Sequence, residues 1–363
     1  MGLSGISCKL WNNEEEKNTE LDIAFTDPDK ISIQYFEQLI PPKIFNKMMK
    51  ENIIRKNNKN NNKLKTMKMS DNLFENENPE NKREIYYRGE FNELDQKHGI
   101  GKMIIINKNK EKFIYYGIWE NDEIIEGRIY YMDESEYNGQ IKNYLRHGKG
   151  EYVSELEKYE GIWKEDKKDG FGKIKFKDGM KYEGEFKNNK FNGKGDLYLP
   201  NGAYYSGNFV NNLFNGEGFF QQKNNIYNGH FKNGLFNGYG EFKWIDGIDK
   251  TIYKGNYSNG KKDGKGTLIL KNGDIFKGNW ESGYPHGEGV YETKNRKYFA
   301  NWRTGIFTQL VDVEEKKGAE EENICLNFQT RNENVDIANI ATSLNSNLSC
   351  ISTLIDASVE IFH

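Results

Sequence analysis

The fold of this chain is decided by a stretch that begins Tyr182-Glu183-Gly184-Glu185-Phe186, continues through residues 187–192 and ends with Gly193-Lys194-Gly195. The same order of residue types returns along the chain. The first glycines of successive units are Gly89, Gly117, Gly139, Gly161, Gly184, Gly207, Gly229, Gly255 and Gly278, and the steps between them are 28, 22, 22, 23, 23, 22, 26 and 23. A nearly constant step of this size predicts an array of small supersecondary units, not one globular core.

Each unit is expected to be a β-hairpin. Side chains alternate between the two faces of a strand, so Tyr182, Gly184 and Phe186 share one face while the glutamates between them share the other. This alternation is typical of strands with one buried and one solvated face. Asn-Gly and Asp-Gly pairs tolerate the positive φ of tight turns. They predict a turn inside each hairpin, as at Asn192-Gly193, and another between units, as at Asn201-Gly202.

The strand glycines lie on the same face as the rings, so we expect them to leave space for a ring from the neighbouring hairpin. Stacked hairpins would then share a continuous aromatic spine. Its rings can be partner anchors or core, because folding needs the same residues. The predicted spine and groove residues are Tyr159, Trp163, Tyr182, Phe186, Tyr205, Phe209, Tyr227, Phe231, Tyr253, Tyr257, Phe276 and Trp280.

The pattern resembles the membrane occupation and recognition nexus (MORN) repeat, over about residues 86–304. The resemblance implies an all-β fold, in which tandem hairpins form an elongated, twisted, single-layer antiparallel sheet. We expect about nine repeats over 86–306. Gly127-Arg128-Ile129 departs from Gly-x-Gly in the second unit, and residues 243–252 predict a longer turn in the seventh. A degenerate tenth unit with Ala300 in place of the glycine is the expected cap.

Short helical or disordered flanks are expected on both sides of the array. Residues 1–85 form an N-terminal extension with an amphipathic helix at about 42–56, followed by an Asn/Lys-rich linker at 52–63. Residues 307–363 form a charged linker and a C-terminal amphipathic helix. Both helices either pack on the array or dock another protein. The residues of the candidate docking helix are Ile337, Ile340, Leu344, Leu348, Ile351 and Leu354.

Composition and chemistry exclude several classes of function. The net charge of −3 does not favour nucleic acid. Three scattered cysteines indicate no disulfide framework and fit a reducing compartment, so a cytoplasmic location is expected. His98, His147 and His286 stand in units far apart along a rod, which argues against a shared metal site. No nucleophile–base pair stands out, so we predict no enzyme, no cofactor and no metal.

The leading functional hypothesis is a structural scaffold that binds partner protein segments along the repeat groove. By analogy with similar arrays, we expect a cytoskeletal component or a radial-spoke-like part of the ciliary axoneme, with axonemal or cytoskeletal proteins as partners. Free sheet edges also allow a homodimer. The alternative is a membrane-associated adaptor that binds anionic phospholipids through basic hairpin loops. The lysines of those loops are Lys164, Lys167, Lys168, Lys187, Lys190, Lys232, Lys261 and Lys262.

Overall fold

The computed structural model of the chain describes residues 33–50, 65–69 and 83–316, which form two short helices and one long sheet. The helices are α1 (Ile33–Gln38) and α2 (Pro42–Lys50). The strands are β1 (Lys65–Met69), β2 (Glu84–Phe91), β3 (Lys97–Ile106), β4 (Lys112–Glu120), β5 (Glu123–Tyr130), β6 (Glu136–Lys142), β7 (Leu145–Val153), β8 (Glu157–Lys164), β9 (Lys167–Phe176), β10 (Lys181–Lys187), β11 (Lys190–Tyr198), β12 (Tyr204–Val210), β13 (Leu213–Gln222), β14 (Asn225–Lys232), β15 (Leu235–Asp246), β16 (Asp249–Ser258), β17 (Lys261–Ile269), β18 (Ile275–Glu281), β19 (Tyr284–Glu292), β20 (Arg296–Arg303) and β21 (Ile306–Glu315).

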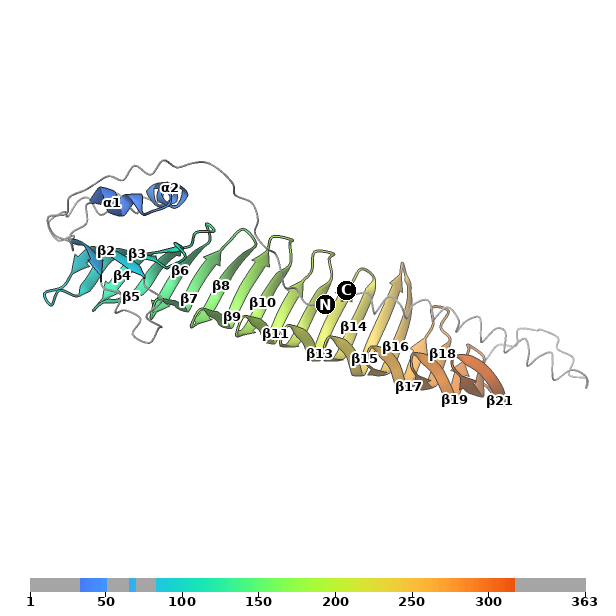
Figure 1. Ribbon diagram of the computed structural model, residues 1–363. Helices are drawn as coiled ribbons and strands as arrows, with labels where there is room; N and C mark the ends of the chain where they lie inside the picture. Colours follow the sequence, from blue (N-terminus) through green and yellow to red (C-terminus); the bar gives the residue numbers. More distant parts are fainter. Residues whose placement is uncertain (1–32, 51–64, 70–82, 317–363) are drawn as a thin grey trace, which may run out of the picture.

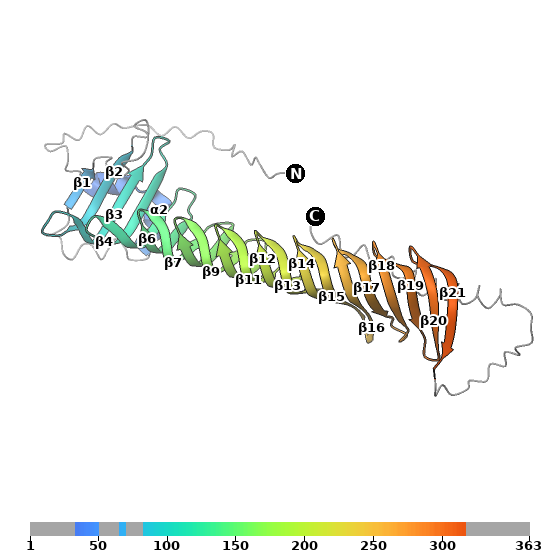
Figure 2. The ribbon, with the colours of Figure 1, turned by 90° about the horizontal axis from the view of Figure 1, so that it is seen from below.

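The sheet is a single antiparallel layer in which each strand pairs with the next one in sequence. The 21 strands form a long twisted rod whose two ends are far apart (Figures 1 and 2). Because every connection joins neighbouring strands, the rod grows by the addition of hairpins, as expected for a repeat array. The all-β, elongated, single-layer fold predicted from the sequence is confirmed.

A row of glycines crosses the sheet from β2 to β19, one in each strand. Gly184 of β10 faces Gly172 of β9 and Gly195 of β11, and the same pairing of glycine with glycine recurs in the neighbouring hairpins. Ala300 continues the row in β20. Directly after the glycine of the first strand in most hairpins, as between Gly184 and Phe186, the register shifts in a β-bulge, whereas in β4–β5 the shift lies between Ile118 and Trp119. Such bulges bend strands and increase their twist.

The space above most of these glycines is filled by a tyrosine of the same hairpin, and above Gly278 and Gly289 it is filled by Phe276. A Cβ atom on Gly184 would lie 2.6 Å from the hydroxyl oxygen of Tyr182, and one on Gly195 would lie 2.5 Å from its Cε2. The Tyr182 hydroxyl donates to the Glu185 carbonyl oxygen at 2.8 Å. The expectation that the glycines accommodate a ring from the neighbouring hairpin is therefore wrong. Two residues along a strand bring a side chain back to the same face, so the ring lies flat over its own glycine pair.

Rings of neighbouring hairpins interlock beside this row, edge to face. Tyr182 meets Phe209 of the next hairpin with ring centroids 5.1 Å apart and an interplanar angle of 89°. Tyr205 meets Phe231 in the same way, at 5.2 Å and 90°. Each such pair contributes about 0.5–1.5 kcal/mol beyond the area it buries. The predicted spine is therefore continuous, and its links are the contacts between hairpins.

The turn inside each hairpin lies elsewhere than predicted. In β10–β11 it consists of Asn188 and Asn189, whose φ angles of 49° and 66° are those of a type I′ turn. Asn192-Gly193 lies within β11, where Gly193 has φ 83°. The prediction failed because the turn at Asn188-Asn189 and the strand position of Gly193 both have positive φ, and the sequence signal at Asn192-Gly193 marks the second of these. The turn between units at Asn201-Gly202 is confirmed, with φ 82° at the glycine.

The ends of the array and its seventh unit also differ from expectation. The extra residues of that unit lengthen β15 and β16 instead of enlarging the turn, with Asp246 paired to Asp249 at the tip. The tenth unit forms a full hairpin, because 306–315 is a strand and not part of a linker. A strand at 65–69 pairs with β2 at the other end, inside the predicted extension.

The N-terminal helices pack on the face of β2–β5 opposite the spine (Figure 1). Phe36, Ile40, Ile44 and Met48 are buried there against the sheet. They cover Tyr86, Ile104, Ile114 and Tyr130, which we call the proximal patch. Of the two alternatives for the N-terminal helix, packing on the array is the one observed. Helix α2 is described as far as Lys50, and the rest of the predicted helix, to 56, and the predicted linker at 52–63 lie outside the described residues.

Candidate functional site

The twelve rings predicted as spine residues form the core of the rod, and none is more than 6% exposed. Partner binding through them stays a prediction, and their burial limits direct contact to a partner that displaces them. The candidate docking helix at 337–354 lies outside the described residues. The surface that a partner meets first is the opposite face of the sheet, which we call the outer face.

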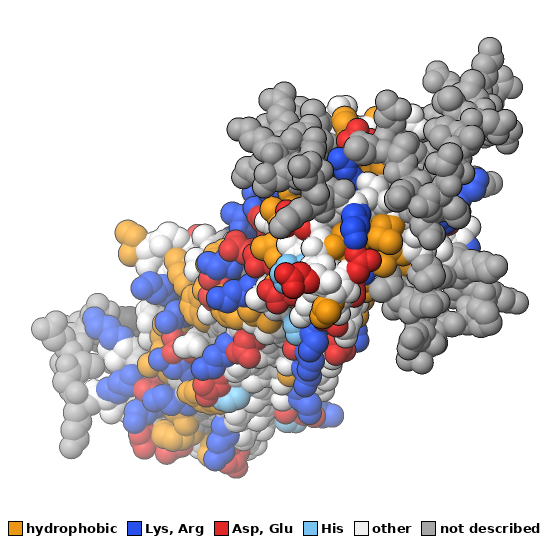
Figure 3. Space-filling view, turned by 90° about the vertical axis from the view of Figure 1, so that its left-hand side faces the viewer, with side chains coloured by type: hydrophobic (Ala, Val, Ile, Leu, Met, Phe, Trp, Pro, Cys, Tyr) orange, Lys and Arg blue, Asp and Glu red, His pale blue; other side chains and the backbone are white. Residues whose placement is uncertain are grey.

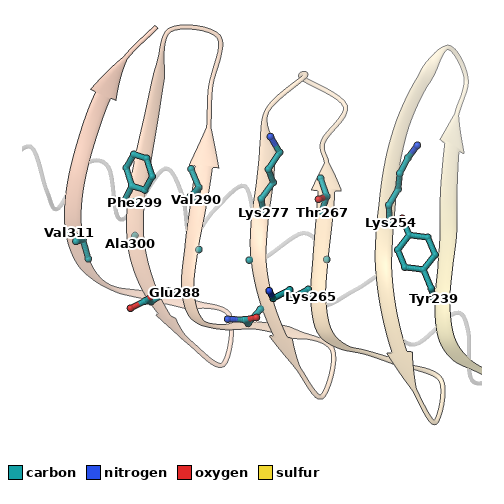
Figure 4. Close-up of a pocket in the computed structure, with 14 residues that line it drawn as sticks. Tyr239, Lys254, Lys265, Thr267, Lys277, Glu288, Val290, Phe299, Ala300 and Val311 are labelled. Carbon is teal, nitrogen blue, oxygen red and sulfur yellow. The ribbon is translucent and has the colours of Figure 1, made fainter.

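A groove follows the glycine row on the outer face, between β15 and β21. Its volume is about 790 Å³. Its floor includes Gly266, Gly278, Gly289 and Ala300, and its walls are the residues on either side of that row (Figure 4). The labelled wall residues are Tyr239, Lys254, Lys265, Thr267, Lys277, Glu288, Val290, Phe299 and Val311. Because glycines form the floor, a bound chain could approach the backbone closely.

The groove combines apolar contact area with paired charges. Tyr239 is 60% exposed and Val311 is 62% exposed, although both are large apolar side chains. Lys254 pairs with Glu241 at 3.0 Å and Lys277 with Glu292 at 2.8 Å, both between ammonium nitrogen and carboxylate oxygen. The lysines thus frame the groove without giving it a strong net charge. Such a surface suits a protein segment better than a phosphate, which would need unpaired cations.

Sequence reasoning missed this groove because it followed the rings that share a face with the glycines. Tyr239 and Phe299 lie one residue before Gly240 and Ala300, so the period of two puts them on the other face. The sequence feature that could have revealed the groove is the presence of aromatic residues, instead of polar ones, directly beside the row glycines. In the middle of the array many of the residues at these positions are charged, as at Glu183 and Lys194, although Phe171 is apolar and exposed.

One position within the spine varies between aromatic and basic residues. Phe191 stacks on Tyr182 with centroids 3.8 Å apart, and the register puts Lys97, Arg146, Lys168 and Lys262 in the same place in other hairpins. These cations lie over rings of the spine, with the Arg146 guanidinium 4.2 Å from the centroid of Trp163. A cation over a ring face is attracted by the ring quadrupole, so a basic side chain can replace an aromatic one there.

Three of these four cations also have a carboxylate partner. Lys97 pairs with Asp122 at 3.4 Å, Arg146 with Asp166 at 3.0 Å and Lys168 with Glu157 at 2.5 Å. Asp122 and Asp166 are the second turn residues of the following hairpins. Burial lowers the pKa of Lys97 and of Lys168, while the nearby carboxylate raises it. Pairing thus stabilises the charged form against desolvation.

Lys262 is the exception. Its side chain is 4% exposed, and its ammonium nitrogen has no hydrogen-bond partner among the described residues. The rings of Trp244, Tyr253 and Trp280 surround it, with centroids 4.8, 5.2 and 5.1 Å from the nitrogen. The corresponding turn position of the next hairpin is Gly283, which carries no side chain. Burial lowers the pKa of Lys262 from 10.5 to about 7.

The predicted basic loops keep six of their eight lysines at the surface. Lys168 and Lys262 point into the spine, so they do not contribute to a basic edge. The exposed lysines flank the type I′ turns, for example Lys187 and Lys190 on either side of Asn188-Asn189. In the view of the rod from the left-hand side of Figure 1, basic and acidic side chains are interspersed (Figure 3). No large field of one sign is visible on that face.

Two further features of the described residues bear on the site. They contain no group of three or more side chains that could hold a metal ion. His98, His147 and His286 belong to β3, β7 and β19, and thus to hairpins well separated along the rod. Within the same described ranges, no helix is long and apolar enough to cross a membrane.

A comparison with protein-family models matches the MORN repeat at residues 137–155, 159–181, 182–204, 205–225, 227–248, 253–275 and 276–296. No curated protein matches the chain. The hairpins of β2–β5 have the same glycine register as the matched ones, since Gly89 faces Gly101 and Gly117 faces Gly127. Repeats of this kind indicate a protein-interaction or membrane-associated role. The repeats matched by sequence and the hairpins seen in the structure coincide, and the chain carries seven MORN repeats across residues 137–296.

Proposed function

We propose that this protein is a non-enzymatic scaffold that holds a segment of a partner protein in the outer-face groove between β15 and β21. The observation that carries the proposal is the groove itself, where the exposed ring of Tyr239 stands beside a floor of glycines. The interlocked spine supports it, because a rigid rod keeps the groove in shape before a partner binds. Preorganisation of this kind lowers the entropic cost of binding.

We further propose that the partners are cytoskeletal or axonemal proteins and that the protein is located in the cytoplasm, at the cytoskeleton or the ciliary axoneme. The support is the shape. An elongated array with many similar surfaces suits a structural part better than a signalling switch. Within the described residues, β1 and β21 each have one edge with no strand partner, which leaves room for a second copy in a homodimer.

Proximity labelling with the tagged full chain in its native cell tests both parts. We expect cytoskeletal proteins among the labelled products, and a signal that resists detergent extraction. Tyr239→Glu should reduce the labelling at least fivefold, because a charge would enter the apolar wall. Tyr198→Glu is the matched control, since Tyr198 is 49% exposed and lies outside the groove. A diffuse signal that detergent removes, or an equal effect of both variants, would contradict the proposal.

The alternative function, an adaptor for anionic phospholipids, is favoured by one observation. Exposed lysines flank successive turns at one edge of the rod, as Lys164 and Lys167 do beside Glu165-Asp166. Each lysine near an anionic surface contributes about 1 kcal/mol. Flotation of the full chain with vesicles of phosphatidylserine and phosphatidylcholine at low salt tests this. Binding that Lys187→Glu with Lys190→Glu abolishes would support the adaptor, and no flotation would remove it.

A further inference from the structure

The outer face has a second apolar patch, at the opposite end of the rod from the N-terminal helices. Ile252 pairs with Ile269, and Ile269 pairs with Ile275, across β16, β17 and β18. Val290 and Phe299 extend this surface across β19 and β20, where they also pair with each other. We call these five residues the distal patch. All five are half-buried.

Three residues of the distal patch, Ile252, Ile269 and Ile275, repeat the register of the proximal patch. Ile104 lies three residues after Gly101 of its strand, and Ile269 lies three residues after Gly266. Ile114 and Ile275 each lie three residues before the row glycine of their own strand. At the same positions β8, β9 and β10 have Lys158, Lys175 and Lys181, and the apolar residues farther along the middle of the rod stand singly or in one pair, Tyr198 and Tyr204. Within the described strands, runs of three or more consecutive apolar residues on this row therefore occur only in β2–β5 and in β16–β18.

At the proximal end this surface has a cover. Helices α1 and α2 bury the proximal patch completely, with Ile104 and Ile114 at 0% exposure. Polar contacts at the rim fix the helices, because Lys47 pairs with Glu136 at 2.8 Å and Glu37 with Arg88 at 3.6 Å. Both helices of the described residues are used in this contact, so neither of them covers the distal patch.

We infer that the distal patch is the docking site of the chain's own C-terminal segment, residues 335–355. That segment carries an apolar stripe at spacings of three and four residues, formed by Ile337, Ile340, Leu344, Leu348 and Ile351 among others, with mostly Ser and Asn between them. As a helix it would present one apolar face and one polar face, as α2 does. It follows the last strand, β21, whose Val311 lines the groove beside the patch.

The lengths agree with this occupant. A helix of 21 residues is about 31 Å long at 1.5 Å per residue. The patch spans the four strand spacings from β16 to β20, about 19 Å at 4.8 Å each. The connecting residues 317–334 can extend to about 59 Å at 3.3 Å per residue, more than the five spacings back from β21 to β16. The segment 317–363 carries seven acidic and two basic residues, and the lysines at the groove rim include Lys254, Lys265 and Lys277. Because Lys254 and Lys277 are already paired with carboxylates, the lengths and the apolar stripe, and not the charge, carry this assignment.

Docking here would also restrict the groove of the proposed function, since Val290 and Phe299 belong to both surfaces. That consequence rests on the proposed function, whereas the docking itself does not. Docking of the C-terminal segment and binding of a partner protein can each occur without the other. The docking experiment therefore contains no partner protein, and its result does not depend on the proposed function.

Cross-linking in the full chain tests the inference with the native Cys350 as one anchor. Cys8 and Cys325 are replaced by serine, and Ile275→Cys supplies the second thiol in the distal patch. The matched control is Lys181→Cys, at the same register position in the uncovered middle of the rod. A bis-maleimide with a reach of about 10 Å, comparable to the separation of a packed helix from a sheet, is added to dilute protein. The products are separated by mass.

We expect a cross-link within one chain for Ile275→Cys at least tenfold more abundant than for Lys181→Cys. Leu344→Asp with Leu348→Asp should abolish it and make the thiol at 275 react at least tenfold faster with a monofunctional maleimide. Equal products from the two positions, or no effect of the aspartates, would overturn the inference. Products only between chains would replace it with a second copy as the occupant. If Ile275→Cys does not fold, Val290→Cys is the second reporter.

Discussion

Substitution of Lys262 by methionine should make the protein more stable at neutral pH and should remove a pH dependence that this lysine creates. In the unfolded chain the ammonium has a pKa of 10.5, and burial in the spine lowers it to about 7. Below about pH 7 both states bind the proton, so the full cost of burying the charge is present. Between pH 7 and 10.5 only the unfolded state binds it, and stability therefore rises with pH.

The magnitude follows from these two values. A pKa lowered from 10.5 to about 7 corresponds to about 5 kcal/mol over the whole range, of which about 2.5 kcal/mol falls between pH 7.5 and 9.5. The rings of Trp244, Tyr253 and Trp280 attract the ammonium and reduce this amount. We expect wild type to gain between about 1 and 2.5 kcal/mol relative to Lys262→Met over that range. Burial raises the pKa of Tyr253 and of Tyr257, so these phenols do not titrate below pH 9.5.

The assay is urea unfolding at pH 7.5, 8.5 and 9.5, followed by tryptophan fluorescence. Trp244 and Trp280 are in contact with the lysine and report on the hairpins concerned, which matters because repeat arrays can unfold in parts. Lys261→Met is the matched control, since its side chain is exposed. Ionisable groups that all three proteins share contribute equally to their pH dependence, so their contributions cancel when one free energy of unfolding is subtracted from another. If the difference in free energy of unfolding between wild type and Lys262→Met stays constant from pH 7.5 to 9.5, the lowered pKa of Lys262 is refuted.

Three further predictions concern the same architecture. Gly283→Asp should supply the carboxylate that Asp122 and Asp166 supply elsewhere, and should flatten the pH dependence of stability in the assay above. Gly195→Ala should cost more than 3 kcal/mol in urea unfolding, because its Cβ would overlap Tyr182, whereas Gly202→Ala, with φ 82° and open space, should cost about 1 kcal/mol. Tyr182→Phe should cost about 1 kcal/mol in the same measurement by removing its hydrogen bond to the Glu185 carbonyl, and no change would contradict that role of the hydroxyl.

The sequence was sufficient to predict the hairpin array because every unit repeats the same combination of a bulky ring and a glycine on one face of a strand. The ring needs the space that the missing side chain leaves. It was not sufficient to identify which ring fills which space. Tyr182 and Phe209 each lie two residues from the row glycine of their own strand, one before it and one after it. Only the three-dimensional packing shows that the first covers a glycine pair and the second contacts a ring of the neighbouring hairpin. Turn placement failed for a similar reason, since Asn188-Asn189 and Gly193 both adopt positive φ. The groove at Tyr239 was missed because the repeat does not specify its outer face.

This division between the two faces explains where function can be encoded in a repeat protein of this kind. On the spine face a substitution changes contacts within its own hairpin and with both neighbours, so the residue types there stay close to the repeat. The outer face beside the glycine row has no such constraint, and its residues vary from charged pairs such as Lys173–Glu183 in the middle to apolar patches at the ends. Information about partners must therefore lie in the departures from the repeat on that face.

Lys262 is the instructive exception within the spine: the residue that covers it, Trp244, comes from the lengthened strands of the seventh unit. The extra residues of the seventh unit thus supply a ring that covers the buried ammonium of Lys262. We expect deletion of these residues to lower the free energy of unfolding of the wild type more than that of a chain that already carries Lys262→Met.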